Sequence, residues 1–216
     1  MIKKGFLSIA LGSLLFSGLQ AREGGALVGV GGFFGFDGWI RWQDPSQSPA
    51  RFGGLGGSGD ILIGYEAIFA KWFGIRTYAS FEYGTFFFKN APEFLDAKTT
   101  NLFDTALNLD LLFDFVSRDS FSLGFFVGVS GGLHYWYGPL INGLQDNTVR
   151  RLFGSVGLNT GFSFGIASNH ALDVLVKISF LEDLVLRQGL QVGISKPYMV
   201  GLRYIYSFGG GSFYPF

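Results

Sequence analysis

Apolar and polar side chains alternate with a period of two through most of this chain from about residue 60 onward. In the stretch 103–115, every second residue starting from Phe103 is apolar except Thr105, and four of the residues between them are Asp or Asn. A β-strand points successive side chains to opposite faces. The pattern therefore predicts strands that carry one apolar face and one polar face.

The predicted apolar faces need a cover, and the composition favours lipid. Phenylalanine accounts for 26 of the 216 residues, and no amphipathic helical pattern offers a second layer to bury it. If the apolar face of each strand contacts lipid, the polar face lines the interior. The charged residues on that face are Asp60, Glu66, Arg76, Glu82, Asp104, Asp110, Asp114, Asp173, Lys177 and Arg203. A one-residue slip would place these charges in hydrocarbon, at about 2–4 kcal/mol for a basic residue near the midplane. The strand register is therefore strongly specified.

Eight segments show the alternation, near residues 25–36, 59–70, 74–88, 102–116, 121–136, 151–166, 171–181 and 196–208. The connectors between them alternate strictly in length: 71–73, 117–120 and 167–170 are short and turn-like, whereas 37–58, 89–101, 137–150 and 182–195 are long. Short periplasmic turns and long outer loops are typical of membrane barrels. The sequence thus predicts an all-β fold, an eight-stranded antiparallel transmembrane β-barrel whose N- and C-termini are periplasmic.

The first 21 residues have the features of a secretory signal peptide. A short basic start is followed by an apolar run that ends at the small residue Ala21. We expect a cleaved signal peptide over 1–21, a barrel over 22–208 and a short Gly-rich periplasmic tail over 209–216. No later run approaches the 18 or so apolar residues of a transmembrane helix.

The composition excludes some partners and some sources of stability. Loss of Lys3 and Lys4 with the signal peptide leaves 14 basic residues (16 − 2) against 16 acidic ones. No positive charge excess points to nucleic acid. The chain has no cysteine, so no disulfide framework can support the fold.

Aromatic residues gather at both ends of the predicted strands. Trp39, Trp42, Phe86–Phe88 and Tyr135–Tyr137 lie toward the outer ends, and Trp72, Phe73, Phe115, Phe121 and Phe208 lie toward the periplasmic ends. Aromatic rings favour the two interfaces of a membrane. We interpret both clusters as aromatic girdles.

The C-terminal part of the chain resembles a known family. Gly201, Tyr204, Tyr206 and Phe208 belong to a strand similar to the one that outer-membrane barrels present to their assembly machinery. More narrowly, the stretches 158–162, 170–180 and 204–208 resemble the C-terminal region of the Helicobacter outer-membrane protein family, and the resemblance is best over residues 120–208. It implies a barrel in the outer membrane of a Gram-negative bacterium. The family's large adhesins and porins carry a long N-terminal extracellular portion without a counterpart here, so no receptor-binding residue is carried over.

Five interior charges are expected to share one layer of the lumen. Glu66, Arg76, Asp110, Lys177 and Arg203 each fall about four to six residues above the periplasmic end of their strand, some 10–15 Å up the barrel. Two acids and three bases at this height can pair and fill the interior. An ion-conducting path is the alternative, although an eight-stranded barrel is only wide enough for side chains to fill it.

No motif points clearly to catalysis, a cofactor or a metal. Ser130 and His134 lie four residues apart on one strand face, about 13 Å, which is too far for a nucleophile and its base. We expect His134 to fill the lumen and donate one hydrogen bond. Two histidines and no cysteine provide no metal site, and the acids of the outer loops, Asp183 among them, are expected to be solvated. The inward glycines, such as Gly128, are expected to make room for larger neighbours rather than bind nucleotides.

The predicted function is a structural or surface-interaction role of adhesion type, with a lumen filled by side chains. Trp39, Trp42 and Phe52 in the longest predicted loop are the candidate surface contacts, although the two tryptophans also fit a girdle. A small pore or channel is the alternative, and a lipid-A-modifying enzyme is a third hypothesis. The expected partners are outer-membrane lipid and lipopolysaccharide, the barrel-assembly machinery and a candidate host-surface ligand.

Overall fold

The computed structural model describes residues 24–43, 50–88, 98–118, 121–143, 151–167, 169–187 and 190–209. The predicted signal peptide 1–21 and all but the first residue of the predicted tail 209–216 lie outside these ranges. The elements are β1 (Gly25–Gln43), β2 (Ala50–Ala70), β3 (Phe73–Phe88), β4 (Thr99–Arg118), β5 (Phe121–Tyr137), α2 (Pro139–Gly143), β6 (Leu152–Ile166), β7 (His170–Ser179), β8 (Glu182–Arg187), β9 (Leu190–Ser195) and β10 (Tyr198–Ser207).

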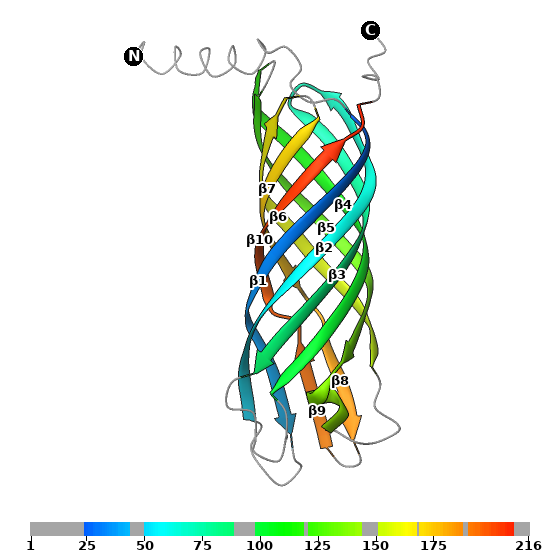
Figure 1. Ribbon diagram of the computed structural model, residues 1–216, viewed down its shortest axis with the longest axis vertical. Helices are drawn as coiled ribbons and strands as arrows, with labels where there is room; N and C mark the ends of the chain where they lie inside the picture. Colours follow the sequence, from blue (N-terminus) through cyan, green and yellow to red (C-terminus); the bar gives the residue numbers. More distant parts are fainter. Residues whose placement is uncertain are drawn as a thin grey trace, which may run out of the picture.

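Eight of these strands form a closed antiparallel barrel, as the sequence predicts. The order β10-β7-β6-β5-β4-β3-β2-β1 closes through β1 and β10, which pair from Leu27 with Ser207 to Phe36 with Tyr198. The start of β1 and the end of β10 therefore lie at the same end of the barrel (Figure 1). We call this the terminal end, and we call the opposite end, where β1 passes into β2, the loop end.

The prediction of a long loop over 37–58 is wrong, because β1 and β2 continue through most of it. After a bulge between Gly35 and Gly38, the strands pair as far as Trp42 with Ala50. The glycine run of β2 is a strand whose inner face must admit large rings from β3. A Cβ atom on Gly54 would lie 2.6 Å from the Phe88 ring, so the absence of side chains there makes room for a neighbour.

The predicted loop 182–195 also differs, because it contains the hairpin β8–β9. β9 pairs with the loop-end part of β1, from Trp39 with Ser195 to Gln43 with Gln191, and so continues the position of β10 in the wall. The interruption between β9 and β10 falls at Lys196 and Pro197. Proline has no backbone N–H to donate to a ladder, which explains the break.

The two faces of the strands follow the predicted alternation. On β3 and β4 the interior positions are buried almost without exception, while the outward column of β4 exposes large apolar residues such as Leu107, Leu109 and Leu111. The outward column of β10 does the same with Val200, Leu202 and Tyr204. Such a continuous exposed apolar surface fits a lipid environment. None of the described helices has the length and hydropathy needed to span a membrane.

The two predicted aromatic girdles have different outcomes. At the terminal end, Trp72, Phe115, Phe121 and Phe208 are exposed and Phe73 is half-buried, and the rings of Trp72 and Phe73 are 5.7 Å apart. At the loop end, Tyr135 and Phe87 point outward. The assignment is wrong for three members there, because Phe86, Phe88 and Trp136 occupy interior positions and are fully buried.

An arginine on the outward face provides a test of this arrangement. Leu107 lies near the middle of β4 and is 73% exposed. We expect Leu107→Arg to destabilise the barrel folded in phospholipid vesicles, lowering its free energy of unfolding by about 2–4 kcal/mol, because the substitution places a charge in hydrocarbon. Urea titration of the refolded barrel measures this change, and Leu107→Ala is the control for lost side-chain area. Equal values for the two variants would contradict the assignment of this face to lipid.

Candidate functional site: the charged lumen

Arg76 of β3 lies between two carboxylates in the interior near the terminal end. Its Nη2 atom is 2.9 Å from Asp110 Oδ2 on β4 and 2.8 Å from Asp173 Oδ2 on β7, and all three side chains are 0% exposed. Glu66, directly opposite Arg76 on β2, is also fully buried. A Cβ atom on Gly128 would collide with Asp110, so this glycine leaves space for the carboxylate. Arg76 therefore connects three walls of the lumen.

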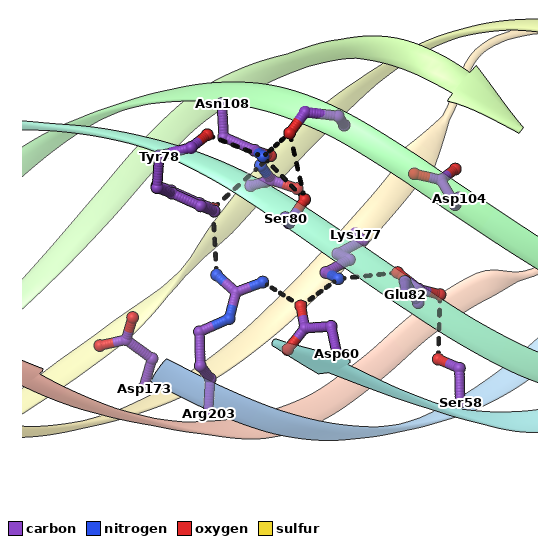
Figure 2. A network of polar contacts seen from close by, with 12 residues as sticks. Ser58, Asp60, Tyr78, Ser80, Glu82, Asp104, Asn108, Asp173, Lys177 and Arg203 are labelled. Carbon is purple, nitrogen blue, oxygen red and sulfur yellow. Dashed lines mark hydrogen bonds and ion pairs between the residues drawn. The ribbon is translucent and has the colours of Figure 1, made fainter. Parts of the chain in front are cut away.

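A second group of contacts is centred on Arg203 of β10 (Figure 2). Its partners Asp60 and Tyr78 lie closer to the loop end than Glu66 and Arg76 do on the same two strands. Arg203 Nη2 donates to Asp60 Oδ2 at 2.7 Å, and its Nη1 donates to the Tyr78 hydroxyl at 3.0 Å. Across the lumen, Asn159 donates to Asn108 Oδ1 at 2.8 Å, and Asn108 donates to Ser80 Oγ at 2.9 Å. Charged and neutral polar side chains thus share this level.

Two lysines continue the network toward the loop end. Lys177 Nζ lies 2.8 Å from both Asp60 Oδ2 and Glu82 Oε2, and it also lies 3.9 Å from the centre of the Phe33 ring. Lys196, from the link between β9 and β10, lies 3.4 Å from Glu82 Oε1 and 3.2 Å from Asp104 Oδ2. Two carboxylates at these distances favour the charged form of the Lys196 ammonium group.

His134 and an apolar cluster close the loop end. His134 Nε2 contacts Asp183 Oδ2 of the β8–β9 hairpin, and Trp136 Nε1 donates to the same oxygen at 2.6 Å. Buried apolar residues from several strands and from α2 pack around them: Phe86, Phe88, Leu102, Leu140, Ile141, Phe153, Ile194 and Met199. The end of the lumen is therefore filled by aromatic and aliphatic side chains.

The structure places the five predicted layer residues in the interior, but not in one layer. Arg76 contacts Asp110, and Glu66 is paired in register with Arg76. Arg203 and Lys177 both contact Asp60 instead, and Lys177 extends further to Glu82. The lumen charges thus form a column over several levels.

Sequence reasoning missed two members of the column, and in both cases the cause is the unrecognised hairpin. Asp183 was expected to be a solvated loop acid, yet it is buried under His134 and Trp136. Lys196 lies outside the alternating pattern of β10, because Pro197 interrupts the strand. No period of two connects either residue to the interior, so the pattern offered no signal for them.

A small polar cavity of about 40 Å³ lies beside Lys177 and Lys196. Its lining is mainly hydroxyl, amide and charged groups, including Ser130, Ser155, Asn159, Lys177 and Lys196. A volume of about 10–15 Å³ is enough for one water molecule. The cavity can therefore hold a few waters, which is far smaller than the usual volume of a ligand pocket.

The described residues show no arrangement that suits catalysis or metal binding. The polar partners of His134 are carboxylates of Asp183 and Asp104, and in the described part of the chain no contact joins it to Ser130. Among the same residues, no group of three or more His, Cys, Asp or Glu could hold a metal ion. The lumen therefore contains acidic and basic side chains that form ion pairs with one another.

The remaining predicted site residues lie on the outside or at the loop end. On β10, Tyr204 and Phe208 are exposed and Tyr206 is half-buried, whereas Gly201 lies on the inner column, where an added Cβ would collide with Phe33. The backbones of Trp39, Trp42 and Phe52 lie on the paired part of β1 and β2 rather than in a loop. Their side chains fall outside the described features.

The two arginines should differ in their importance for stability. Arg76→Ala leaves Asp110 and Asp173 facing each other in a buried site, which we expect to cost about 3–5 kcal/mol. Arg203→Ala should lower the melting temperature less, because Asp60 keeps Lys177 as a partner. Thermal unfolding followed by the shift between folded and unfolded bands on a gel measures both, with the exposed turn variant Lys71→Ala as the control. A larger loss for Arg203→Ala would contradict the pairing described above.

Solved structures of outer-membrane barrels resemble this chain in fold. OprG from Pseudomonas aeruginosa has a TM-score of 0.56 at 11% identity, covering 89% of this chain and 100% of that one. Neisserial surface protein A has a TM-score of 0.44 at 16% identity, covering 85% of this chain and 99% of that one. Ail, the attachment invasion locus protein of Yersinia pestis, has a TM-score of 0.37 at 13% identity, with 85% and 99% covered. At these identities the likeness concerns the fold alone.

The sequence itself also matches a protein family. No curated protein matches the chain. The model of the Helicobacter outer membrane protein family matches residues 60–208, from the middle of β2 through the whole of β10. This range includes Asp60, Arg76, Lys177 and Arg203, and it exceeds half of the 216 residues. The chain, an outer-membrane β-barrel, therefore belongs to the Helicobacter outer membrane protein family.

Proposed function

We propose that this protein is a closed, non-conducting barrel that acts at the cell surface through its loop end. The proposal that the barrel is closed rests on the observation that side chains fill its lumen. Arg76 connects Asp110 and Asp173 across the interior with none of the three side chains exposed. A hydrated ion would have to break these contacts and then pass the apolar cluster around Phe88.

The orientation of the barrel supports a surface role. Placing the terminal end in the periplasm follows from the expected signal peptide and from the rule that membrane barrels have short periplasmic turns. The turn between β2 and β3 is only Lys71–Trp72, and it lies at the terminal end. The loop end, with the β1–β2 hairpin, α2 and the β8–β9 hairpin, then faces the outside of the cell.

The lengths of the strands indicate how much structure would extend beyond the membrane. β1 has 19 residues, β2 has 21 and β4 has 20. A tilted strand needs about 9–11 residues to cross. The loop-end parts of these strands can therefore project past the lipid and present a rigid surface, on which Trp39, Trp42 and Phe52 are the proposed contacts for a host-surface ligand.

The proposal extends to two partners in the membrane. The apolar outward faces would contact lipid and, on the outer side, lipopolysaccharide. The outward aromatic residues Tyr204 and Phe208 of the last strand remain the proposed signal for the barrel-assembly machinery, with the inward Gly201 and the half-buried Tyr206 completing the motif.

A planar-bilayer recording tests the closed lumen. We expect the refolded protein to produce no reproducible conductance steps, because successive levels of ion pairs and the apolar cluster obstruct the interior. The control for incorporation into the bilayer is recovery of the folded protein band from the same vesicles that are fused with the bilayer. Regular steps from the unaltered protein would overturn the proposal in favour of a small channel.

A cell-adhesion assay tests the surface role. We expect replacement of Trp39, Trp42 and Phe52 by alanine to reduce adhesion of the bacteria to host cells by about tenfold, as expected for losing aromatic contacts at an interface. The control is Phe34→Ala, which removes an exposed aromatic residue from the lipid-facing part of β1. Equal adhesion of the triple variant and the unaltered strain, at equal surface abundance, would remove these three residues from the proposal.

A further inference from the structure

Six outward residues of β3, β4 and β5 form two adjacent rows near the loop end. Each row consists of residues that are directly paired between the three neighbouring strands. We call these residues the outer patch: Tyr83, Phe103 and Tyr135 in the first row, and Thr85, Asn101 and Tyr137 in the row nearer the loop end. Because the patch is built on continuous strand pairing, the backbone fixes the spacing of its side chains.

The tyrosine rings of the outer patch lie close together. The Tyr137 ring is stacked on that of Tyr135 at 5.9 Å, and it lies 6.3 Å from the ring of Tyr83. Tyr83 is 50% exposed and Tyr135 is 37% exposed. A tyrosine side chain combines an apolar ring with a polar hydroxyl. Such rings can contact the C–H groups of a sugar while their hydroxyls bond to its oxygens.

The outer patch also carries polar groups that contact with acyl chains alone does not require. Thr85 Oγ1 donates to Asn101 Oδ1 at 2.9 Å, and this pair is exposed. The bond uses the carbonyl of Asn101, so its amide N–H groups are the donors that a ligand can use. Lys98 is exposed at the loop-end side of the patch, where its backbone carbonyl accepts from Phe88 N at 2.9 Å. Lys98 therefore places a positive charge beside the tyrosines.

The same three strands become mainly apolar toward the terminal end. The next outward row contains Phe81, Thr105 and Leu133, and Leu107 lies in the row beyond it. Phe81 is 41% exposed, Leu133 is 48% exposed and Leu107 is 73% exposed. A ligand that lies along these strands is therefore matched by a polar, positively charged surface at one end and by an apolar surface at the other. A lipid with an anionic saccharide head group has this division.

Another pair of outward rings near the loop end has a different setting. Phe36 of β1 and Tyr198 of β10 pair directly, and their rings are 6.1 Å apart. The next residue on β1 is Asp37, which is exposed. Two aromatic rings are sufficient for a girdle at the membrane interface. A carboxylate beside them repels an anionic ligand, so this pair provides a comparison surface for the outer patch.

We propose that the outer patch binds the saccharide head group of lipopolysaccharide, with the acyl chains lying on the apolar rows beside it. Tyr83 and Tyr137 contact the sugar rings, Asn101 donates to a sugar oxygen, and Lys98 pairs with a phosphate of the head group. This inference rests on the proposed orientation, in which the loop end faces the outside, because the outer leaflet contains the lipopolysaccharide. It depends neither on adhesion to host cells nor on the closed lumen.

Binding of lipopolysaccharide by the refolded protein in detergent micelles tests the site. The probe is purified lipopolysaccharide with a short saccharide and a fluorescent label. We expect Tyr83→Ala/Tyr137→Ala to weaken binding about tenfold or more, as for the loss of aromatic contacts at the centre of an interface. The matched control Phe36→Ala/Tyr198→Ala removes two outward rings from the comparison surface and should bind as tightly as the unaltered protein. Equal affinities of the two double variants would overturn the proposal.

A charge reversal tests the contact with phosphate. Lys98→Glu should weaken binding of the labelled probe about tenfold and leave binding of dephosphorylated lipopolysaccharide unchanged, because only the first carries the charge that Lys98 attracts. Equal effects on both ligands would contradict the ion pair and overturn this part of the site. The gel shift of the folded band shows that each variant has formed a barrel.

Competition distinguishes lipopolysaccharide from other ligands of the outer patch. Unlabelled lipopolysaccharide should displace the probe, whereas phosphatidylglycerol and the delipidated oligosaccharide at the same concentration should not. Displacement by phosphatidylglycerol would mean that the patch is an ordinary lipid girdle. Displacement by the oligosaccharide would mean that it is a site for soluble glycans. Either result would overturn the proposal.

Thiol labelling of intact bacteria tests the orientation separately. The chain has no cysteine, so Lys98→Cys and Lys71→Cys each provide a single thiol, one at the loop end and one in the turn at the terminal end. A membrane-impermeant maleimide should label the first on intact cells and the second only after the outer membrane is permeabilised. The reverse order would overturn the orientation and the inference with it. The expected order, combined with equal affinities of the two double variants, would remove the lipopolysaccharide site alone.

Discussion

The structure depends on a constraint that comes from lipid: a charged side chain on a membrane-spanning strand has only the narrow interior of the eight-stranded barrel to occupy. Each strand can turn one column outward, and a basic residue there costs about 2–4 kcal/mol at mid-membrane. The interior is itself poor in water, so the charges inside must find partners. Arg76 is shared between Asp110 and Asp173, and Asp60 is shared between Arg203 and Lys177. Three bases and three acids thus meet this demand from different walls.

The large interior side chains depend on small residues in the barrel wall. Asp110 fits beside Arg76 because the facing residue of β5 is Gly128, and Phe88 fits because the facing residue of β2 is Gly54. The glycines of this chain are therefore part of the interior packing, and the large interior groups could not be accommodated if these positions carried side chains. Because the interior is packed in this way, the polar cavity that remains has a volume of only about 40 Å³.

The period of two, together with the alternating lengths of the connectors, was enough to predict the barrel and its antiparallel order. The period also predicted the inward direction of residues such as Arg76 and Lys177. It could not predict which charges meet, because partners such as Lys177 and Asp60 are 117 residues apart and meet only through barrel closure. The period of two also failed where polar and apolar side chains do not alternate. The Gly-rich start of β2 has too few side chains to alternate, and Phe86, Phe88 and Trp136 look like girdle aromatics until their inward direction is known.

The loop end shows why such failures concentrate in one place. The terminal end is bounded by tight turns such as Lys71–Trp72, so the strand register is carried from one strand to the next without interruption. At the loop end Pro197 interrupts the wall, and the chain before it forms the β8–β9 hairpin. Asp183 and Lys196 then act as interior residues although neither belongs to an alternating barrel strand. A charge column built by barrel strands at its base is thus completed by a connecting segment at its top.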